Sequence, residues 1–208
     1  MDLEIDRKIQ LNHQNEKFAA YGEDVRAVGW SSVESQESRA KVLSEIGNLN
    51  SRSILDVGCG FGDLYTHLEK QGVHPSKYVG IDINPKIISI ARKRLPKLKF
   101  EVRDSMDSEL KDKFDFVVAA GIFGLETPNW QDVVEKQLSK MYDLCEIGVA
   151  VNFLSHYTAG EKLPNSHYAD PADILEFVLK NLSNRVVLRH DYRPNDFIVY
   201  VYRDKARK

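Results

Sequence analysis

Residues Ile54–Leu64 read ILDVGCGFGDL, an apolar run followed at once by a glycine-rich turn. Three glycines fall at alternate positions in this turn: Gly58, Gly60 and Gly62. Glycine lets a chain turn sharply, and it lets a ligand approach the backbone with no Cβ in the way. Free N–H groups in such a turn, and at the start of a following helix, can bind ligand oxygens. The pattern of strand, glycine turn and helix therefore predicts a nucleotide-binding site, with a tight turn that binds nothing as the alternative.

Two aspartates follow at the ends of the next two predicted strands. Asp82 ends the apolar run Lys77–Asp82, twenty-two positions after Gly60. A carboxylate at this place can accept hydrogen bonds from both hydroxyls of a ribose, and it can also cap the helix that starts at Pro85. Asp104 follows the third strand, where a side chain can reach an adenine amino group. Three signals in this order favour a nucleotide-like ligand over an empty turn.

Short apolar runs alternate with helix-like segments along the chain, which is typical of an α/β fold. Seven strands are predicted, at Ser53–Val57, Lys77–Asp82, Lys99–Arg103, Phe114–Ala119, Gly148–Leu154, Arg185–Arg189 and Phe197–Tyr202. Helices are predicted between them, at about Leu64–Gln71, Pro85–Leu95, Trp130–Cys145 and Ala172–Leu182. Because only Asp191–Asp196 separates the last two strands, they should form an antiparallel hairpin. The predicted fold is a seven-stranded, mostly parallel sheet with helices on both faces and an antiparallel last strand.

The first fifty residues lie outside this alternation. They predict two helices, at about Leu3–Ala20 and Ser35–Ile46, which we expect to form an N-terminal helical cap over one edge of the sheet. Residues 51–208 should then form one compact domain, as expected for a chain of 208 residues.

The bulk composition excludes several classes of protein. A net charge of −2 gives no electrostatic case for nucleic acid or an anionic membrane as a partner. The two cysteines, Cys59 and Cys145, have neither metal-ligand spacing nor a paired framework, so we expect no metal site. The first ten residues are charged, unlike a signal peptide, and no apolar run approaches the length of a transmembrane helix. We therefore expect a cytoplasmic protein.

The glycine spacing also distinguishes between ligands, because a dinucleotide site reads G-x-G-x-x-G whereas this turn reads G-x-G-x-G. The stretch ILDVGCGFGDL resembles motif I of the class I S-adenosylmethionine-dependent methyltransferases, which is close to (L/V)-D-(V/L)-G-(C/T/S)-G-x-G. Asp82 and Asp104 match that family's ribose and adenine positions, and FDFVVAAGIF resembles its fourth strand. The resemblance covers about Ile46–Tyr202. It implies a Rossmann-like methyltransferase domain with S-adenosylmethionine as cofactor and S-adenosylhomocysteine as product.

The resemblance implies roles for the residues that would hold the adenosine. Asp82 would hold the ribose, Ile83 would pack on the adenine, and Asp104 with Ser105 would lie at the adenine edge.

The same resemblance places other residues beside the methionine part of the cofactor. The three glycines of the turn would line the cofactor, and Asp56 would order the turn or meet the methionine amino group. Ala120 and Gly121 would run beside the methionine part. Cys59 is expected to pack as a small apolar residue.

The acceptor site should lie at the carboxyl ends of the strands, where an open α/β sheet binds its ligands. Methyl transfer needs the acceptor to be positioned and water to be excluded, and an oxygen or nitrogen acceptor can also need a base. The loops after the fifth strand and in the last hairpin carry His156 and His190, the candidate bases. Their alternative role is that of solvated loop histidines.

Four aromatic residues are candidates for binding the acceptor: Tyr21, Trp30, Tyr157 and Tyr192. An aromatic ring beside a sulfonium gains cation–π attraction of about 0.5–2 kcal/mol. Trp30 could equally fix the N-terminal cap to the core. Gln36 and Arg39, on the second predicted helix, could face the site, but they are interpreted as exposed polar residues.

A small polar metabolite, methylated at oxygen or nitrogen, is the acceptor class left by elimination. The size of the chain argues against a protein or a long RNA as substrate, because enzymes for such substrates usually carry extra binding domains. The Asn/Asp-Pro-Pro-Tyr and Pro-Cys motifs of DNA and pyrimidine methyltransferases are not found in the sequence. One alternative is a methyltransferase-like module that binds cofactor or a partner without turnover. Another is an NAD-dependent oxidoreductase, which the glycine spacing disfavours.

Overall fold

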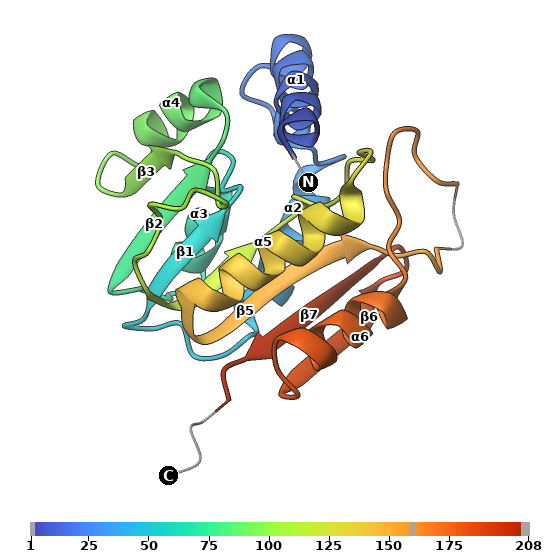
Figure 1. Ribbon diagram of the computed structural model, residues 1–208. Helices are drawn as coiled ribbons and strands as arrows, with labels where there is room; N and C mark the ends of the chain where they lie inside the picture. Colours follow the sequence, from blue (N-terminus) through green and yellow to red (C-terminus); the bar gives the residue numbers. More distant parts are fainter. Residues whose placement is uncertain (1–2, 159–160, 205–208) are drawn as a thin grey trace.

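A seven-stranded sheet forms the centre of the molecule, in the order β3-β2-β1-β4-β5-β7-β6 (Figure 1). The computed structural model describes residues 3–158 and 161–204. The strands are β1 (Ser53–Val57), β2 (Lys77–Asp82), β3 (Lys99–Val102), β4 (Phe114–Ala119), β5 (Cys145–Leu154), β6 (Val186–Arg193) and β7 (Asp196–Tyr202). β7 runs antiparallel to β5 and β6, whereas the other neighbouring strands pair in parallel. The predicted sheet, with its antiparallel last strand, is confirmed.

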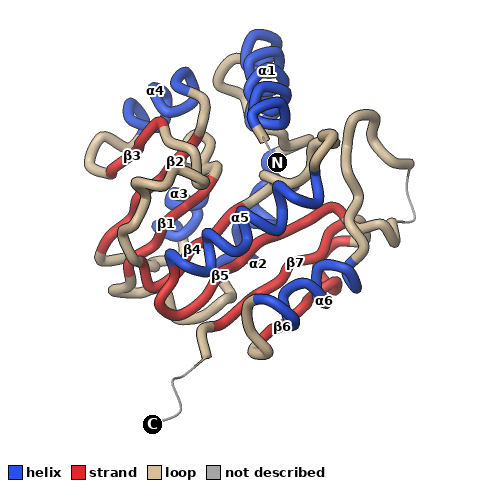
Figure 2. The backbone as a smooth tube through the Cα atoms, in the orientation of Figure 1, coloured by secondary structure: helices blue, strands red, loops and turns tan. Residues whose placement is uncertain are grey.

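Helices cover both faces of this sheet (Figure 2). They are α1 (Glu4–Tyr21), α2 (Val33–Ser44), α3 (Asp63–Lys70), α4 (Pro85–Arg94), α5 (Trp130–Leu144) and α6 (Pro171–Asn181), with a 3₁₀ turn at Val25–Val28. α5 and α6 pack on the face that carries Leu55 and Val117, and α2, α3 and α4 pack on the face that carries Ile54 and Phe116. Because both faces are buried, the central strands are almost continuously apolar. Among residues 3–158 and 161–204, no helix is long and apolar enough to cross a bilayer.

Local signals fix where two of the helices start. The Asn84 side chain accepts a hydrogen bond from Lys86 N at 3.0 Å, and the Asp170 side chain accepts one from Ala172 N at 2.8 Å. Each capping residue is followed by a proline in the first turn. A side-chain acceptor satisfies a free N–H of the first turn, and proline has no N–H to satisfy there. The helix starts predicted at these two places are confirmed.

Three strands are longer than predicted, β7 by one residue at its start and β5 and β6 by more. β5 begins at Cys145, three residues early, because the chain becomes extended directly after α5. β6 continues to Arg193, so most of the predicted connection Asp191–Asp196 is strand and residues 194–195 make the turn. The register between β6 and β7 shifts within this extension, which places an irregularity near the end of the hairpin.

The two N-terminal helices have different positions. α1 lies beyond the carboxyl ends of the strands, as a cap (Figure 1). α2 instead packs on the face of the sheet through its apolar residues, including Val42. The hydroxyl of Tyr200 donates to Val42 O at 2.5 Å, and that of Tyr202 donates to Ile46 O at 2.9 Å. The expectation that both helices form a cap over one edge is therefore wrong for α2, because its apolar side is buried against the strands.

Candidate active site

A cavity of about 500 Å³ lies at the carboxyl ends of the strands, between the sheet and α1. The ends of β1 to β5, the β6–β7 hairpin, the segment 27–31 and one side of α1 all contribute to its lining. This is the place where an open α/β sheet is expected to bind a ligand. The cavity has the volume of a site for small molecules.

The glycine turn forms part of the cavity wall next to β1. The turn is tied to β2, because Gly58 N and Cys59 N both donate to Ile81 O, at 2.8 and 3.1 Å. Gly58 has φ +69°, and a Cβ there would lie 2.3 Å from Ile122 Cγ2. Gly58 lines the cavity, whereas Gly62 lies outside its lining and starts α3. At Gly62, with φ +85°, a Cβ would lie 2.7 Å from Leu95, so this glycine allows a helix and a loop to pack closely.

Asp82 lies at the end of β2 with its carboxylate in the cavity lining, and its side chain is buried. Its Oδ1 accepts from Asn84 N at 2.9 Å, and its Oδ2 accepts from Gly60 N at 3.4 Å. Burial raises the pKa of Asp82 to about 6, and the two backbone hydrogen bonds oppose that rise. The carboxylate therefore orders the glycine turn and is also placed to accept hydrogen bonds from a ligand.

Asp56, two residues before the first glycine, faces a smaller pocket beside Gly60 and Asp63. Its carboxyl is fully enclosed and accepts a short hydrogen bond from the Tyr78 hydroxyl. Burial raises the pKa of Asp56 to about 7, the Tyr78 hydrogen bond lowers it, and the nearby Asp82 raises it further. Of the two roles considered for Asp56, these contacts favour ordering of the turn.

The predicted adenine residues line the cavity at the end of β3. Asp104 pairs with Arg7 of α1, with Nε and Oδ2 3.2 Å apart. Ser105 is buried, and its hydroxyl accepts from Gln137 Nε2 at 2.9 Å. Ile83 follows Asp82 in the same part of the lining. The structure therefore brings Asp82, Ile83, Asp104 and Ser105 together in one part of the cavity.

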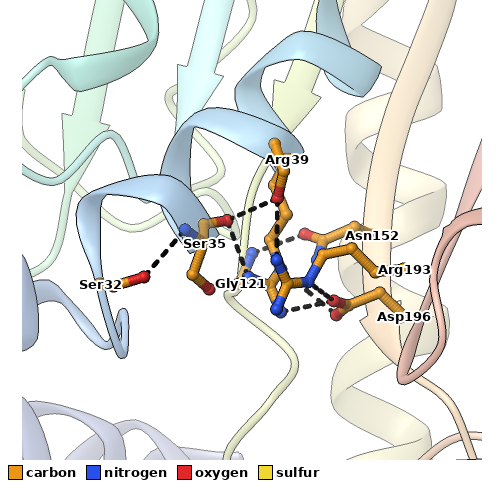
Figure 3. Close-up of polar contacts among 8 residues, drawn as sticks. Ser32, Ser35, Arg39, Gly121, Asn152, Arg193 and Asp196 are labelled. Atoms are coloured by element: carbon orange, nitrogen blue, oxygen red, sulfur yellow. Dashed lines mark hydrogen bonds and ion pairs between the residues drawn. The ribbon is translucent and has the colours of Figure 1, made fainter.

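The residues after β4 divide between the two pockets. Gly121 lines the large cavity with φ +73°, and a Cβ there would lie 2.8 Å from the Trp30 ring. Its N–H donates to Asn152 Oδ1 at 2.8 Å, as Figure 3 shows. Ala120 lies in the smaller pocket, beside Asp56. Trp30 therefore both lines the cavity and packs on the chain after β4.

The far end of the cavity contains a buried ion cluster that connects α2 to the β6–β7 hairpin (Figure 3). Arg39 donates through Nε and Nη2 to the two oxygens of Asp196, at 3.2 and 2.5 Å, and through Nη1 to Ser35. Arg193 approaches the same carboxylate, with Nε 3.1 Å from Asp196 Oδ2. The interpretation of Arg39 as an exposed polar residue is wrong. Its partner is 157 residues away, so the sequence pattern of α2 gave no signal of it.

The candidate bases His156 and His190 are not among the residues of the described chain that line the cavity. His156 is exposed, and its Nδ1 lies 3.5 Å from the Lys162 ammonium. His190 stacks on Phe197, and its Nε2 lies 2.6 Å from the Ser155 hydroxyl.

Of the four candidate aromatic residues, Trp30 alone is among the described lining residues. Tyr21 and Tyr157 are exposed, and the Tyr157 hydroxyl donates to Asp170. Tyr192 is mostly buried beside the ion cluster, and burial raises the pKa of its hydroxyl.

Sequence reasoning missed the side of α1 that faces the cavity, which includes Gln10, His13, Gln14 and Lys17. These residues are spaced as one face of a helix, but polar residues at that spacing are usually solvated. Burial, together with Lys17, lowers the pKa of His13, so its imidazole is neutral near pH 7. Among the described residues, His13 is the histidine that lines the cavity.

Fold and site together define a class I S-adenosylmethionine-dependent methyltransferase. A model of the methyltransferase domain matches residues 54–146. The protein named "Putative methyltransferase Rv1506c" of Mycobacterium tuberculosis is 30% identical over 158 residues, which cover 72% of this chain and 92% of that protein. The chain therefore belongs to the methyltransferase family, and it is an enzyme that uses S-adenosylmethionine.

Further comparisons agree with this assignment. The magnesium-protoporphyrin O-methyltransferase of Rhodobacter capsulatus is 38% identical over 87 residues, which cover 39% of this chain and 37% of that protein. The crystal structure of the magnesium protoporphyrin IX methyltransferase from Synechocystis PCC 6803, with bound S-adenosylhomocysteine, superposes with a TM-score of 0.67. The match covers 93% of this chain and 98% of that one at 16% identity, so it shows a shared fold.

The residues present fit the cofactor. Within the described chain, Gln14 Oε1 and Gln137 Oε1 are buried without a hydrogen-bond partner, and both residues line the cavity. A buried acceptor without a partner costs about 1–3 kcal/mol, so a ligand that donates to it is favoured. The carboxylates of Asp82 and Asp104 lie in the same lining. Hydroxyl and amino groups of an adenosine can donate to all four side chains.

Proposed function

We propose that this enzyme transfers a methyl group to an oxygen or nitrogen of a small polar metabolite. The observation that carries the proposal is a single cavity that joins the carboxylates of Asp82 and Asp104 to the ion cluster around Asp196. S-adenosylmethionine supplies an activated methyl group, so the protein has mainly to bind, orient and exclude water. The Rhodobacter relative acts, by its name, on magnesium-protoporphyrin, also a small molecule.

The walls of the cavity favour a small acceptor over a polymer. α1 is fixed across the opening at its start, where Asp6 accepts from Asn129 N and Nδ2 at 2.9 and 2.8 Å. The loops after β4 and β5 join beside the cavity through an antiparallel bridge between Leu125 and Ser166. A volume of about 500 Å³ behind these segments suits a metabolite.

His13 is the residue that we assign as the proton acceptor, for acceptors that lose a proton on methylation. It lines the cavity from α1, and its lowered pKa keeps the imidazole neutral and able to accept a proton. The nearby Lys17 also lowers this pKa.

Two measurements test the proposal. Saturating S-adenosylmethionine should raise the unfolding midpoint by about 5–11 °C, since a ligand at a hundredfold its Kd adds about 2.7 kcal/mol, and NAD should leave the midpoint unchanged. With methyl-labelled cofactor and a cell extract, the label should appear in the filtrate of small metabolites. Label confined to protein or nucleic acid would overturn the small-acceptor proposal, and stabilisation by NAD alone would overturn the cofactor assignment.

A further inference from the structure

The ion cluster at the far end of the cavity carries an excess positive charge. Arg39 and Arg193 share one carboxylate, that of Asp196, so two cations meet one anion. The side chains of Asp196 and Arg39 are 0% and 6% exposed, and that of Arg193 is 27% exposed. In the described part of the chain, no second acid lies within ion-pair distance of either guanidinium. Charges taken out of water are normally paired, so this cluster is one negative charge short.

Arg193 is the member of the cluster whose hydrogen-bond donors are incompletely used. The donors of Arg39 are used by Asp196 and Ser35, and its guanidinium also lies 4.9 Å from the Trp30 ring centroid. Arg193 donates through Nη1 to Ser38 Oγ at 3.2 Å. Its Nε is buried and, among the residues described, has no partner in hydrogen-bond geometry, although Asp196 Oδ2 is 3.1 Å away. Arg39 therefore fixes Asp196, and Arg193 is left to bind a further anion.

The position of Arg193 in the sheet separates it from the adenosine residues. Asp82 ends β2, and Arg193 and Asp196 lie where β6 turns into β7. Four strand spacings separate β2 from β7 in the sheet order, which is about 19 Å at ~4.8 Å each. Asn195 and the loop residues 163–166 complete this end of the cavity. The cluster thus lies on the opposite side of β4 from the predicted adenosine residues.

We propose that the methyl acceptor carries an anionic group, a carboxylate or a phosphate, that binds the Arg193 guanidinium at this end of the cavity. The inference rests on the proposed function, because it specifies the substrate of the same site. A planar guanidinium offers paired N–H donors that match the oxygens of either anion. Binding there supplies the missing negative charge and fixes the acceptor at the end of the cavity away from the adenosine. Arg193 is then a residue that determines specificity.

The test uses the full chain loaded with S-adenosylhomocysteine, so that the cofactor end is filled. Benzoate and inorganic phosphate are titrated by calorimetry, with benzamide as a neutral molecule of the same shape as benzoate. The variants are Arg193→Gln, which removes the positive charge, and Arg193→Lys, which keeps the charge but lacks the paired N–H donors of the guanidinium. Arg189→Gln is the matched control, because Arg189 lies on the same strand and pairs with Asp191 and Glu45 outside the cavity.

We expect at least one of the two anions to bind saturably to the wild-type protein, and benzamide not to bind. Arg193→Gln should weaken anion binding about tenfold or more, Arg193→Lys should weaken it less, and Arg189→Gln should leave it unchanged. Retained affinity for S-adenosylhomocysteine shows that each variant is folded.

Three results would overturn the inference. The first is that neither anion binds the loaded wild-type protein. The second is that Arg193→Gln binds the anion as well as the wild type does. In the third, Arg193→Gln loses affinity for S-adenosylhomocysteine and the anions compete with it, which would assign Arg193 to the cofactor's own carboxylate. Failure of the wild-type protein to bind S-adenosylhomocysteine would refute the proposed function itself, whereas the first two results leave that function standing.

Discussion

Gly58 and Gly72 form a matched pair for testing why the glycine turn needs glycine. Both have φ +69°, but they differ in their surroundings. A Cβ at Gly72 would meet nothing within 4 Å among the described atoms, whereas a Cβ at Gly58 would lie 2.3 Å from Ile122 Cγ2. Alanine at Gly72 therefore tests the backbone conformation alone, and alanine at Gly58 tests the backbone conformation together with the contact.

The expected magnitudes follow from these two terms. The left-handed conformation costs about 1–2 kcal/mol for alanine, offset by about 0.4–1 kcal/mol from the stiffer unfolded chain, so Gly72→Ala should cost about 0–1.5 kcal/mol. Gly58→Ala should lower the unfolding free energy by the same conformational cost and by about 1–3 kcal/mol more, because the new methyl group overpacks against Ile122. For a chain of this size the difference corresponds to a midpoint about 2–12 °C lower for Gly58→Ala.

The assay is urea or thermal unfolding of the two single variants, of Ile122→Ala and of Gly58→Ala/Ile122→Ala. Truncation of Ile122 removes Cγ2 and leaves its Cβ, 3.8 Å from the new methyl group, which is ordinary van der Waals contact. The double variant should therefore be about 1–3 kcal/mol more stable than the sum of the single changes predicts. Equal costs at Gly58 and Gly72, or additivity with Ile122→Ala, would refute the steric explanation.

Three further predictions concern the ionisable residues. Asp82→Asn should weaken S-adenosylmethionine binding at least tenfold by calorimetry, and equal affinity in the variant would count against the ribose role. The affinity of the wild-type protein should decrease when the pH is lowered below about 6, because the raised pKa of Asp82 leaves its carboxyl protonated there. The pKa of Asp56 is raised to about 7, so its stabilising contribution is complete below about pH 4 and is lost as the pH rises through 7. Asp56→Asn should therefore reduce the difference in unfolding free energy between pH 5 and pH 8 by about 2–3 kcal/mol, and an unchanged difference would argue against a buried Asp56 with a raised pKa. For an acceptor that loses a proton, His13→Ala should lower kcat about a hundredfold, whereas His156→Ala and His190→Ala should stay within about threefold; the reverse pattern would restore the loop histidines as bases.

The cofactor end of the site could be predicted because its signals are local. Asp82 is the last residue of β2 and Asp104 lies two residues after β3, and parallel strands bring their carboxyl ends to one edge of the sheet. The glycine turn has the same property, since its φ values and its contact with β2 depend on a few consecutive residues. The mostly parallel sheet and the helices on both of its faces follow from the alternation of strands and helices along the chain. These steps need no knowledge of which distant side chains meet.

The acceptor end could not be predicted in this way, because its contacts join residues that are far apart in sequence. Arg39 and Asp196 are 157 residues apart. The arginine lies on the buried side of α2, three residues before Val42, but this spacing gives no indication of its partner. His13 becomes a lining residue only because α1 folds over the carboxyl ends of the strands.

The loop histidines show the converse case. Their segments approach the carboxyl edge of the sheet, but neither histidine is among the described residues that line the cavity. His156 points to solvent near Lys162, and His190 stacks on Phe197 with its Nε2 at the Ser155 hydroxyl. Asp191, which follows His190 in the sequence, accepts hydrogen bonds from Arg189 at 3.0 and 3.1 Å. In an extended strand, neighbouring side chains point to opposite faces, so adjacency of a histidine and an aspartate argues against their contact. A pair two residues apart, such as Arg189 and Asp191, is the spacing at which a strand brings partners together.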